Sequence, residues 1–382
     1  MSSAVDRAVW GTQAPSLAAL EGDLARVRRG RSAHVREQVA TVARAAVVNI
    51  VVVAVREMHA RRAARTVSEL AMRHPSRAII VLSDRAAAPD APPRIDLYAQ
   101  IPAIDRSAMV SYEQILVSAS GRATDRLVSV VVPLLVPDLP VFLWWTDAPP
   151  IGARHFEELV AISDRLVVDS ADFARPEETL PELSHVCSLG ARRCGLTDLN
   201  WGRVTCWREL VTQLFDVPAW RPWLDRVDGI RIAFGVDADG RQVHPSQALL
   251  LVGWLASRLG WTAAEPISPS EAGGYLFAVR RRDGEVVRVR IRPRYALGMG
   301  AGDVVAVRIE ASDGAHRAEF AVTRAAGGRN AVASVLLDGR PVSERSLPHA
   351  QNDVVELLSE ELTIVAADRV YEEALATLLR LS

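Results

Sequence analysis

The chain has 382 residues, 49% of them hydrophobic and 24% charged, and its formal net charge is −1. This length predicts two domains, and the composition is that of a folded globular protein with no global field to attract nucleic acid or an anionic membrane. All 45 residues of the lysine and arginine class are arginines, which excludes a P-loop lysine, a Schiff-base lysine and a lysine general base.

The first part of the chain predicts a βαβ unit. Leucines at helical spacing indicate an amphipathic helix over residues 17–35. The run 47–55 is β-branched and apolar on both faces, as in a central strand. A helix follows and ends at Pro75, and residues 78–82 form the next strand. A strand, a crossover helix and a strand predict parallel pairing.

The following segment continues as alternating strands and helices. Residues 95–101 and 110–117 predict a hairpin of extended segments. A helix opens at Gly121 and is kinked at Pro133. A strand is then predicted at 141–145, a helix at 156–162 and a strand at 165–168. This alternation indicates a layered α/β domain.

The second half changes its pattern. Residues 175–265 are mainly helical in pattern, and after Gly273-Gly274 alternating residues predict an antiparallel meander that ends in a helix at 353–381. We therefore predict an N-terminal layered α/β domain with a mostly parallel or mixed sheet, followed by a C-terminal α+β domain with helices and an antiparallel meander. The predicted divisions are an N-terminal helical arm (1–35), the α/β domain (36–172) and the α+β domain with its helical connector (173–382).

The cysteines and the apolar runs indicate a cytoplasmic protein. Cys187, Cys194 and Cys206 form no C-x-x-C pair, and residues 1–10 show no apolar core behind a basic segment. The longest apolar runs fall short of the ~20 residues that cross a bilayer. We expect reduced thiols and no membrane contact. His185 with these cysteines matches no standard zinc spacing, so we expect no metal site.

The glycine cluster Gly298-Met299-Gly300-Ala301-Gly302 resembles a phosphate loop only superficially. A phosphate loop is followed by a helix N-terminus, whereas Asp303 leads into a predicted strand. We predict a turn between strands. No G-x-G-x-x-G follows the first strand, which argues against a dinucleotide-dependent dehydrogenase.

Three carboxylates follow predicted strands, at the edge where α/β sheets bind ligands. Asp84, Asp147 and Asp169 are candidates for a sugar or metal site. The alternative is that they cap the helices that follow. The pattern alone leaves both open.

Arginines are densest between residues 280 and 294. Arg288, Arg290 and Arg292 share one face of a strand because side chains alternate, and they are a candidate anion-binding or acidic-partner surface. The alternative is a solvated face neutralised by Glu310 and Glu319. No aromatic residues interleave with the arginines, so a nucleic-acid partner is not expected.

The nine tryptophans concentrate in two places, Trp144-Trp145 and the segment from Trp201 to Trp223. Tryptophan is enriched at the anchoring points of protein interfaces. Some of these side chains are candidate partner contacts. The alternative is that they fill the seam between the two domains.

Several strings resemble the glucose-6-phosphate dehydrogenase assembly protein family (OpcA). They include Arg73-His74-Pro75-Ser76-Arg77, a proline-aspartate-leucine-proline string that runs into Trp144-Trp145, and Asp198-Leu199-Asn200-Trp201-Gly202-Arg203. The strings follow the family's order from about residue 36 to the C-terminus. The likeness is in several strings at once, which makes it fairly specific.

The resemblance implies a non-catalytic assembly factor and allosteric activator that binds glucose-6-phosphate dehydrogenase in the oxidative pentose phosphate pathway, with no cofactor. It implies neither a nucleic-acid nor a membrane partner. The partner-binding or family-motif residues that it suggests are Arg73, His74, Pro75, Arg77, Pro137, Asp138, Pro140, Trp144, Trp145, Asp198, Trp201, Arg203, Trp207 and Arg208. Cysteine-based redox control in some relatives does not carry over, because Ser76 stands where they have cysteine.

Two other functions remain open from the residues. One is an enzyme or sensor with a sugar-phosphate site at the strand ends of the first domain, using Asp84, Asp147 or Arg77. The other is a nucleic-acid adaptor that uses the arginine hairpin. The first predicts stabilisation by sugar phosphates without a partner, and the second predicts salt-dependent binding to any duplex.

Overall fold

The computed structural model describes residues 46–71, 73–84, 95–100, 113–186, 194–236, 245–296, 299–325, 330–349, 353–363 and 367–382. The predicted helix over 17–35 lies outside them. The chain divides into two compact units. Unit 1 is drawn from Met1–Val168, Ser188–Leu196 and Val354–Ala366, and unit 2 from Asp169–Cys187, Thr197–Asp353 and Ala367–Ser382.

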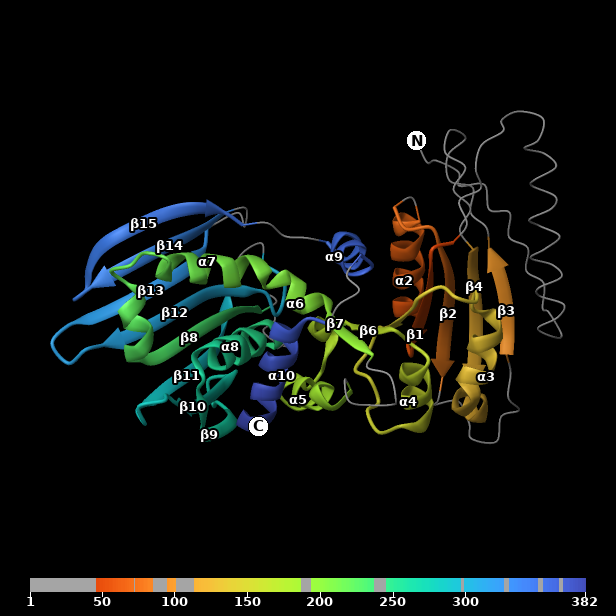
Figure 1. The fold of residues 1–382 in the computed structure, drawn as a ribbon, viewed down its shortest axis with the longest axis horizontal. Helices are drawn as coiled ribbons and strands as arrows, with labels where there is room; N and C mark the ends of the chain where they lie inside the picture. The colour runs from red at the N-terminus through yellow and green to blue at the C-terminus, as the bar shows by residue number, and fades with distance from the viewer. Residues whose placement is uncertain are drawn as a thin grey trace, which may run out of the picture. The chain divides into compact units, whose positions relative to one another are not determined.

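Unit 1 is built on a mostly parallel sheet with the strand order β3-β4-β2-β1-β5-β6-β7 (Figure 1). The predicted βαβ unit is confirmed, because β1 pairs parallel with β2 in a register that sets Val48 opposite Ser76. The predicted hairpin is confirmed as β3 and β4, which pair antiparallel. The strands are β1 (Val48–Ala54), β2 (Ser76–Asp84), β3 (Ile95–Gln100), β4 (Glu113–Ser120), β5 (Val141–Trp145), β6 (Arg165–Val168) and β7 (Gly195–Asp198).

The sheet of unit 1 is covered on both faces. Every residue of β1, β5 and β6 is buried, which requires helices on both sides of the sheet. The predicted helix that opens at Gly121 and is kinked at Pro133 is a series of short helical elements, because 3-10 turns at 121–126 and 132–134 flank the α-helical turn at 127–131, which ends just before Pro133. The helical elements are α2 (Glu57–Leu70), η1 (Gly121–Arg126), α3 (Leu127–Val131), η2 (Val132–Leu134), α4 (Arg154–Ala161) and α9 (Val354–Glu361).

Unit 2 contains an eight-stranded sheet with the order β15-β14-β13-β12-β8-β11-β10-β9. The predicted meander holds on each side of the centre but is wrong at the centre, where β8 separates β12 from β11. β8 pairs antiparallel with β12 and parallel with β11. The strands are β8 (Val227–Val236), β9 (Thr262–Pro269), β10 (Tyr275–Arg280), β11 (Val286–Tyr295), β12 (Val304–Ser312), β13 (Arg317–Arg324), β14 (Asn330–Leu337) and β15 (Arg340–Pro348).

The helices of unit 2 lie on one face of this sheet (Figure 1). Phe320 of β13 contacts Phe215 of α7 there, with ring centroids 4.6 Å apart. On the opposite face, polar side chains alternate with the buried ones along β11. The helical elements are η3 (Ser170–Asp172), α5 (Pro176–Val186), α6 (Leu199–Arg203), α7 (Thr205–Phe215), η4 (Arg221–Arg226), α8 (Ser246–Leu259) and α10 (Arg369–Leu381).

The two units confirm the predicted fold class of an α/β part followed by a part with an antiparallel sheet and helices. The described part of the glycine cluster is a turn between strands, as predicted, and Gly302 has a φ of 86°. This turn crosses the end of β8, because the Gly302 N–H donates to the Gly235 carbonyl at 2.9 Å. Among the described helices, none has the length and apolarity needed to span a lipid bilayer.

Candidate partner-binding site

Two of the predicted motif segments lie at the same edge of the unit 1 sheet. Residues 73–75 lead directly into β2, and residues 136–140 lead directly into β5. The Val47 N–H donates to the Pro75 carbonyl at 2.8 Å, and the Asn49 N–H donates to the Pro140 carbonyl at 2.9 Å. These are the starts of parallel strands, so both segments lie opposite the carboxyl edge where α/β sheets usually bind ligands.

The side chain of Asn49 fixes the 136–140 loop. Its Nδ2 donates to the carbonyls of Val136 (3.0 Å) and Leu139 (3.3 Å), and its Oδ1 accepts from the Val136 N–H at 2.8 Å. Asp138 has a φ of 64°, a conformation that a short polar side chain tolerates better than most. The loop is therefore held in one shape by the core and presents exposed prolines to solvent.

Arg77 belongs to the interior of this edge. It is 5% exposed, and its Nη1 donates to the Leu134 carbonyl at 2.9 Å. His74 is half-buried beside α9, with its Nε2 2.9 Å from the Ser359 hydroxyl. Burial, followed by the charge of Arg73, lowers the pKa of His74. Among residues 73–77, Arg73 is the exposed side chain.

Of the three alternative candidates for a sugar-phosphate site, Arg77 lies at the opposite end of the strands from Asp84 and Asp147. Arg77 and Asp84 stand seven residues apart on β2, which separates them by about 23 Å along the strand. Asp147 accepts from Arg56 Nη2 at 3.0 Å and lies 3.1 Å from His59. Burial raises the pKa of Asp147, but the hydrogen bond from the Val55 N–H, the charge of His59 and the hydrogen bonds from Arg56 and His59 outweigh it and hold that pKa below its usual range.

Trp144 and Trp145 are interior side chains of β5, only 5% and 2% exposed. Trp145 packs edge-on against Phe156 of α4, with centroids 5.1 Å apart. The indole N–H groups of both tryptophans have no hydrogen-bond acceptor among the described residues. These two residues stabilise unit 1, and their contact with a partner stays a prediction.

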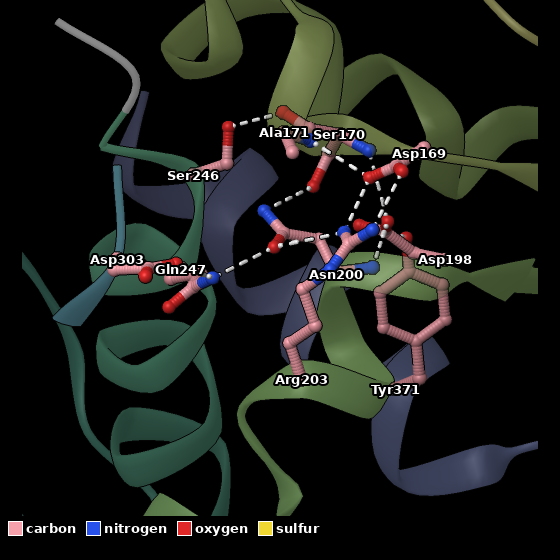
Figure 2. Close-up of polar contacts among 10 residues, drawn as sticks. All are labelled: Asp169, Ser170, Ala171, Asp198, Asn200, Arg203, Ser246, Gln247, Asp303 and Tyr371. Carbon is pink, nitrogen blue, oxygen red and sulfur yellow. Dashed lines mark hydrogen bonds and ion pairs between the residues drawn. The ribbon is translucent and has the colours of Figure 1, made fainter. Parts of the chain in front are cut away.

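Asp198 in unit 2 is the centre of a buried network that we call the Asp198 cluster (Figure 2). Its members are buried or partly buried in unit 2, and they are connected by hydrogen bonds. They are Asp169, Ser170, Asp198, Asn200, Arg203, Ser246, Gln247, Asp303 and Tyr371.

Both aspartates that follow β6 and β7 cap the helical turns after them. Asp169 accepts from the Ala171 N–H at 3.2 Å, and Asp198 accepts from the Asn200 N–H at 2.9 Å and the Ser170 N–H at 3.0 Å. The capping alternative is thus confirmed for Asp169. Arg203 binds the Asp169 carboxylate with two hydrogen bonds of 2.6 and 2.8 Å. This bidentate geometry is the strongest that a guanidinium makes with a carboxylate.

Two amide side chains extend the Asp198 cluster to the sheet. Gln247 donates to Asn200 Oδ1 at 3.0 Å and accepts from the Val304 N–H at 3.0 Å. The Ser246 hydroxyl donates to the Ser170 carbonyl at 2.5 Å. These contacts tie the start of α8 to α6, η3 and β12.

Asp198 is the perturbed acid of the cluster. Burial raises the pKa of Asp198 from 3.8 to about 6, and the nearby charge of Asp169 adds to this, while hydrogen bonds from Ser170 and Asn200 oppose it. Burial lowers the pKa of Arg203, but the Asp169 carboxylate outweighs it and the pKa of Arg203 is raised. The cluster is therefore a set of hydrogen-bonded groups in which the raised pKa of Asp198 is close to neutral pH.

Trp201 joins this cluster to the C-terminal helix. Its Nε1 donates to Asp368 Oδ2 at 2.8 Å, and Asp368 caps α10. The Arg208 guanidinium lies 3.6 Å above the Trp201 ring, a cation–π contact. Burial lowers the pKa of Arg208 to about 10, so Arg208 is charged at neutral pH. Trp201 is 4% exposed, and its indole holds α6, α7 and α10 together.

Trp207 and Cys206 lie in unit 2, and Cys194 lies in unit 1. Trp207 is 1% exposed and packs against His349 with centroids 5.1 Å apart. Cys194 is buried and Cys206 is partly exposed, and neither forms a disulfide with a described residue, whereas Cys187 lies outside the described residues. Within those residues no three His, Cys, Asp or Glu side chains are grouped to hold a metal ion.

The candidate anion-binding arginines lie on the uncovered face of the unit 2 sheet. Along β11, residues 288, 290 and 292 are exposed and residues 287, 289 and 291 are buried, as the alternation predicted. Glu310 and Glu319 do pair with arginines, but with Arg231 and Arg308 of β8 and β12. The predicted neutralisation of the β11 arginines by these two glutamates is therefore wrong, because their partners stand on the neighbouring strands.

Sequence reasoning missed most of the Asp198 cluster. Ser246 and Gln247 carry no motif, Tyr371 opens a string that resembles the family, and all three join the cluster only through the packing of α8 and α10. The sequence did contain an indication for Asp198 at the centre of the cluster, because an aspartate directly before a helical segment is a typical N-cap. The pairing partner of each cap cannot be read from spacing.

Comparison with known families gives two matches in sequence order. The family model for the N-terminal domain of the glucose-6-phosphate dehydrogenase subunit matches residues 67–185, and the model for the C-terminal domain of the same subunit matches residues 194–375. The OxPP cycle protein OpcA of Nostoc punctiforme is 31% identical over 65% of this chain and 52% of its own length. The OpcA protein of Synechococcus elongatus is 29% identical over 56% of this chain and 47% of its own. The chain thus spans about half the length of these relatives.

Similar solved structures share little sequence. An NAD binding oxidoreductase from Klebsiella pneumoniae aligns with 13% identity over 87% of this chain and 94% of its own, with a TM-score of 0.45. A levoglucosan dehydrogenase in complex with NADH and L-sorbose aligns with 12% identity over 87% of this chain and 90% of its own, with a TM-score of 0.43. Scores this low support no conclusion about the chemistry of this chain.

Proposed function

Because the chain belongs to the glucose-6-phosphate dehydrogenase subunit (OpcA) family, we propose that it is a non-catalytic, cytoplasmic assembly factor and allosteric activator of glucose-6-phosphate dehydrogenase. The observation that carries the proposal is the pair of matching subunit domains, which together span residues 67–185 and 194–375. The proposed partner acts in the oxidative pentose phosphate pathway, the process named by the relatives. No cofactor is proposed.

The burial and the hydrogen bonds of the Asp198 cluster support a structural role for its acidic and basic side chains. Asp169 and Asp198 are 6% and 1% exposed, and each accepts hydrogen bonds from backbone N–H groups. Arg203 is committed to Asp169. A catalytic acid or base must reach a substrate, and these groups are instead enclosed and bound to one another.

The connection between β1 and α2 also supports the proposal that the chain binds no dinucleotide. Residues 55–58 contain no glycine, and such turns need glycine for close approach of the pyrophosphate to the backbone. Arg56 and His59 instead meet Asp147 at this carboxyl edge. An ion pair between Arg56 and Asp147 therefore lies at the carboxyl end of β1, the edge at which dinucleotide-binding folds bind the pyrophosphate.

An activator of this kind works through differential affinity. It shifts the dehydrogenase toward its active assembly only as far as it binds that assembly more tightly than the inactive one. A tenfold activation at saturation requires about 1.4 kcal/mol of such preference. We propose two surfaces for this binding. One is the 136–140 loop of unit 1, which Asn49 holds in place, and the other is the exposed face of β11 in unit 2 with Arg288, Arg290 and Arg292.

The test is a titration of purified chain into the cognate dehydrogenase, with NADP reduction and oligomer size followed together. We expect a saturable rise in rate or in substrate affinity and a larger complex, with no NADP reduction by the chain alone. A reaction catalysed by the chain alone, or a dehydrogenase indifferent in rate, affinity and size, overturns the proposal.

A further inference from the structure

The uncovered face of the unit 2 sheet has one neutralised half and one bare half. On β8, β12 and β13, Arg231 and Arg308 are paired with Glu310 and Glu319. Gly229 makes room for this pairing, because a Cβ there would lie 2.7 Å from Glu310 Oε2. Arg231 and Arg308 are therefore neutralised by carboxylates of β12 and β13.

The bare half is a line of four arginines on β11, which we call the arginine row: Arg288, Arg290, Arg292 and Arg294. All four are exposed. None of them forms a hydrogen bond or an ion pair with another described residue. Side chains two residues apart on a strand are about 6.6 Å apart, so the row is a regular line of four positive charges.

The strands on either side leave the row open. Arg288 lies between Gly229 of β8 and Ala278 of β10, and Arg290 lies between Arg231 and Leu276. Glycine and alanine are too short to cover a guanidinium, and Arg231 directly opposite Arg290 is a like charge, which is destabilising in a sheet. A fold that keeps unpaired arginines side by side gains nothing from them internally.

Apolar side chains accompany the row on the same face. Leu276 is 46% exposed and Val286 is 41% exposed. Val286 precedes Arg288 by two residues on β11, and Leu276 stands opposite Arg290. Arginine next to exposed aliphatic surface is the composition of a protein interface, where arginine is enriched.

We propose that the arginine row is the docking surface for a carboxylate-bearing face of the cognate glucose-6-phosphate dehydrogenase, a proposal that rests on the proposed function. The partner must supply aspartate or glutamate side chains about 5 to 7 Å apart, as one edge of a strand or one face of a helix does. Arginine favours such carboxylates because its fork binds both oxygens.

A nucleic-acid strand fits this surface less well. No aromatic side chain stands between the arginines on this face of β11 to stack a base. The Glu310 and Glu319 carboxylates lie on the same face, and they repel a phosphate backbone that runs across the sheet. The row is suited to a compact acidic surface rather than to an extended polyanion.

The test compares two double charge reversals of equal size. R288E/R290E removes the centre of the row, and R62E/R65E reverses two exposed arginines of α2 in unit 1. R288Q/R290Q is a milder version that only removes charge. Thermal melts establish that each variant is folded. Binding to the cognate dehydrogenase is then measured at 50 and 300 mM NaCl.

We expect R288E/R290E to weaken binding at low salt by about tenfold or more and R288Q/R290Q by less, because charges across an interface couple strongly. R62E/R65E stays within about twofold of the unchanged chain. The unchanged chain loses affinity at 300 mM NaCl more steeply than R288E/R290E.

The outcomes separate the two proposals. If the unchanged chain binds the dehydrogenase and R288E/R290E binds equally well, the arginine row is not the docking surface and the proposed function stands. If the unchanged chain neither binds nor activates the dehydrogenase, two proposals are rejected: the proposed function and the docking of the dehydrogenase on the arginine row. A duplex, or a second copy of the chain, whose binding is lost in R288E/R290E while dehydrogenase binding persists also rejects the proposal.

Discussion

The Asp198 cluster and the arginine row hold charged residues of the same unit in opposite states. In the cluster, Arg203 is paired with Asp169 and mostly buried. In the row, four arginines are exposed and have no partner among the described residues. Unpaired buried charge is costly and unpaired exposed charge is not. The cluster therefore stabilises the fold, and the row is free to bind something else.

Among the substitutions that test this comparison, Arg203→Met is expected to lower the free energy of unfolding the most. The change leaves the Asp169 carboxylate, whose side chain is 8% exposed, without its cation. We expect the free energy of unfolding to fall by about 3 kcal/mol, measured by urea denaturation. Arg62→Met on exposed α2 serves as the control and should change it by less than about 0.5 kcal/mol. Equal losses in the two variants would remove the distinction between buried and exposed arginines.

A smaller effect is expected from Asp198→Ala. Two backbone N–H groups, of Ser170 and Asn200, lose their acceptor, which costs about 2 kcal/mol. Asp198→Asn keeps an acceptor oxygen and removes the buried charge, so it should cost less than about 1 kcal/mol at pH 7. A larger loss in the asparagine variant than in the alanine variant would show that the carboxylate charge itself is needed.

The pH dependence of stability isolates the same group. The pKa of Asp198 is raised from 3.8 to about 6 by burial, so the folded chain holds this proton more tightly than the unfolded chain. Its stabilising contribution is full below about pH 4 and is lost as the pH rises through 6. Other carboxylates titrate in this window, so we compare the chain with Asp198→Asn. The difference between them should shift by about 2 kcal/mol from pH 4 to 7, and a constant difference would contradict the buried, perturbed acid.

Trp201→Phe should have a modest effect. It removes the 2.8 Å hydrogen bond to Asp368 and weakens the contact with the Arg208 guanidinium. We expect a loss of about 1 kcal/mol in the free energy of unfolding, with binding to the dehydrogenase affected only as far as the fold is loosened. Full stability with lost binding would instead make Trp201 a direct contact.

The smallest effect on stability is expected at the arginine row. R288E/R290E changes two exposed side chains and relieves the like-charge contact with Arg231. We expect the melting temperature to stay within about 2 °C of the unchanged chain. A large fall would mean that the row has internal partners and is not a free surface.

Strands and helices were predicted well where the period was long and unbroken, as in β1, α2 and β11. The prediction failed at β8, where Gly229 and Gly235 interrupt the pattern and the flanking segments are helical. Trp144, Trp145, Trp201 and Trp207 were candidates for partner contacts or for a seam between the domains; all four are buried, and their contact with a partner stays a prediction. Residue type reveals a tendency to bury area, whereas the contact that buries it depends on tertiary packing.

The arginine row shows which part of a strand can be predicted from the sequence and which part cannot. Strand alternation correctly set Arg288, Arg290 and Arg292 on one face, because the period of 2 is local. Strand order cannot be read from that period, so the prediction did not include β8 and kept open the alternative that Glu310 and Glu319 neutralise β11. Once β8 lies between β11 and β12, those glutamates pair with Arg231 and Arg308 instead.

Arginine footprinting with phenylglyoxal tests the contrast most directly, because it reports every accessible guanidinium of the chain at once. The free chain and its complex with the cognate dehydrogenase are modified in parallel, and each site is quantified by mass spectrometry. We predict that Arg288, Arg290 and Arg292 react in the free chain and are protected in the complex, while Arg62 and Arg65 react in both and Arg203 in neither. Row arginines that remain as reactive in the complex as in the free chain would contradict the account.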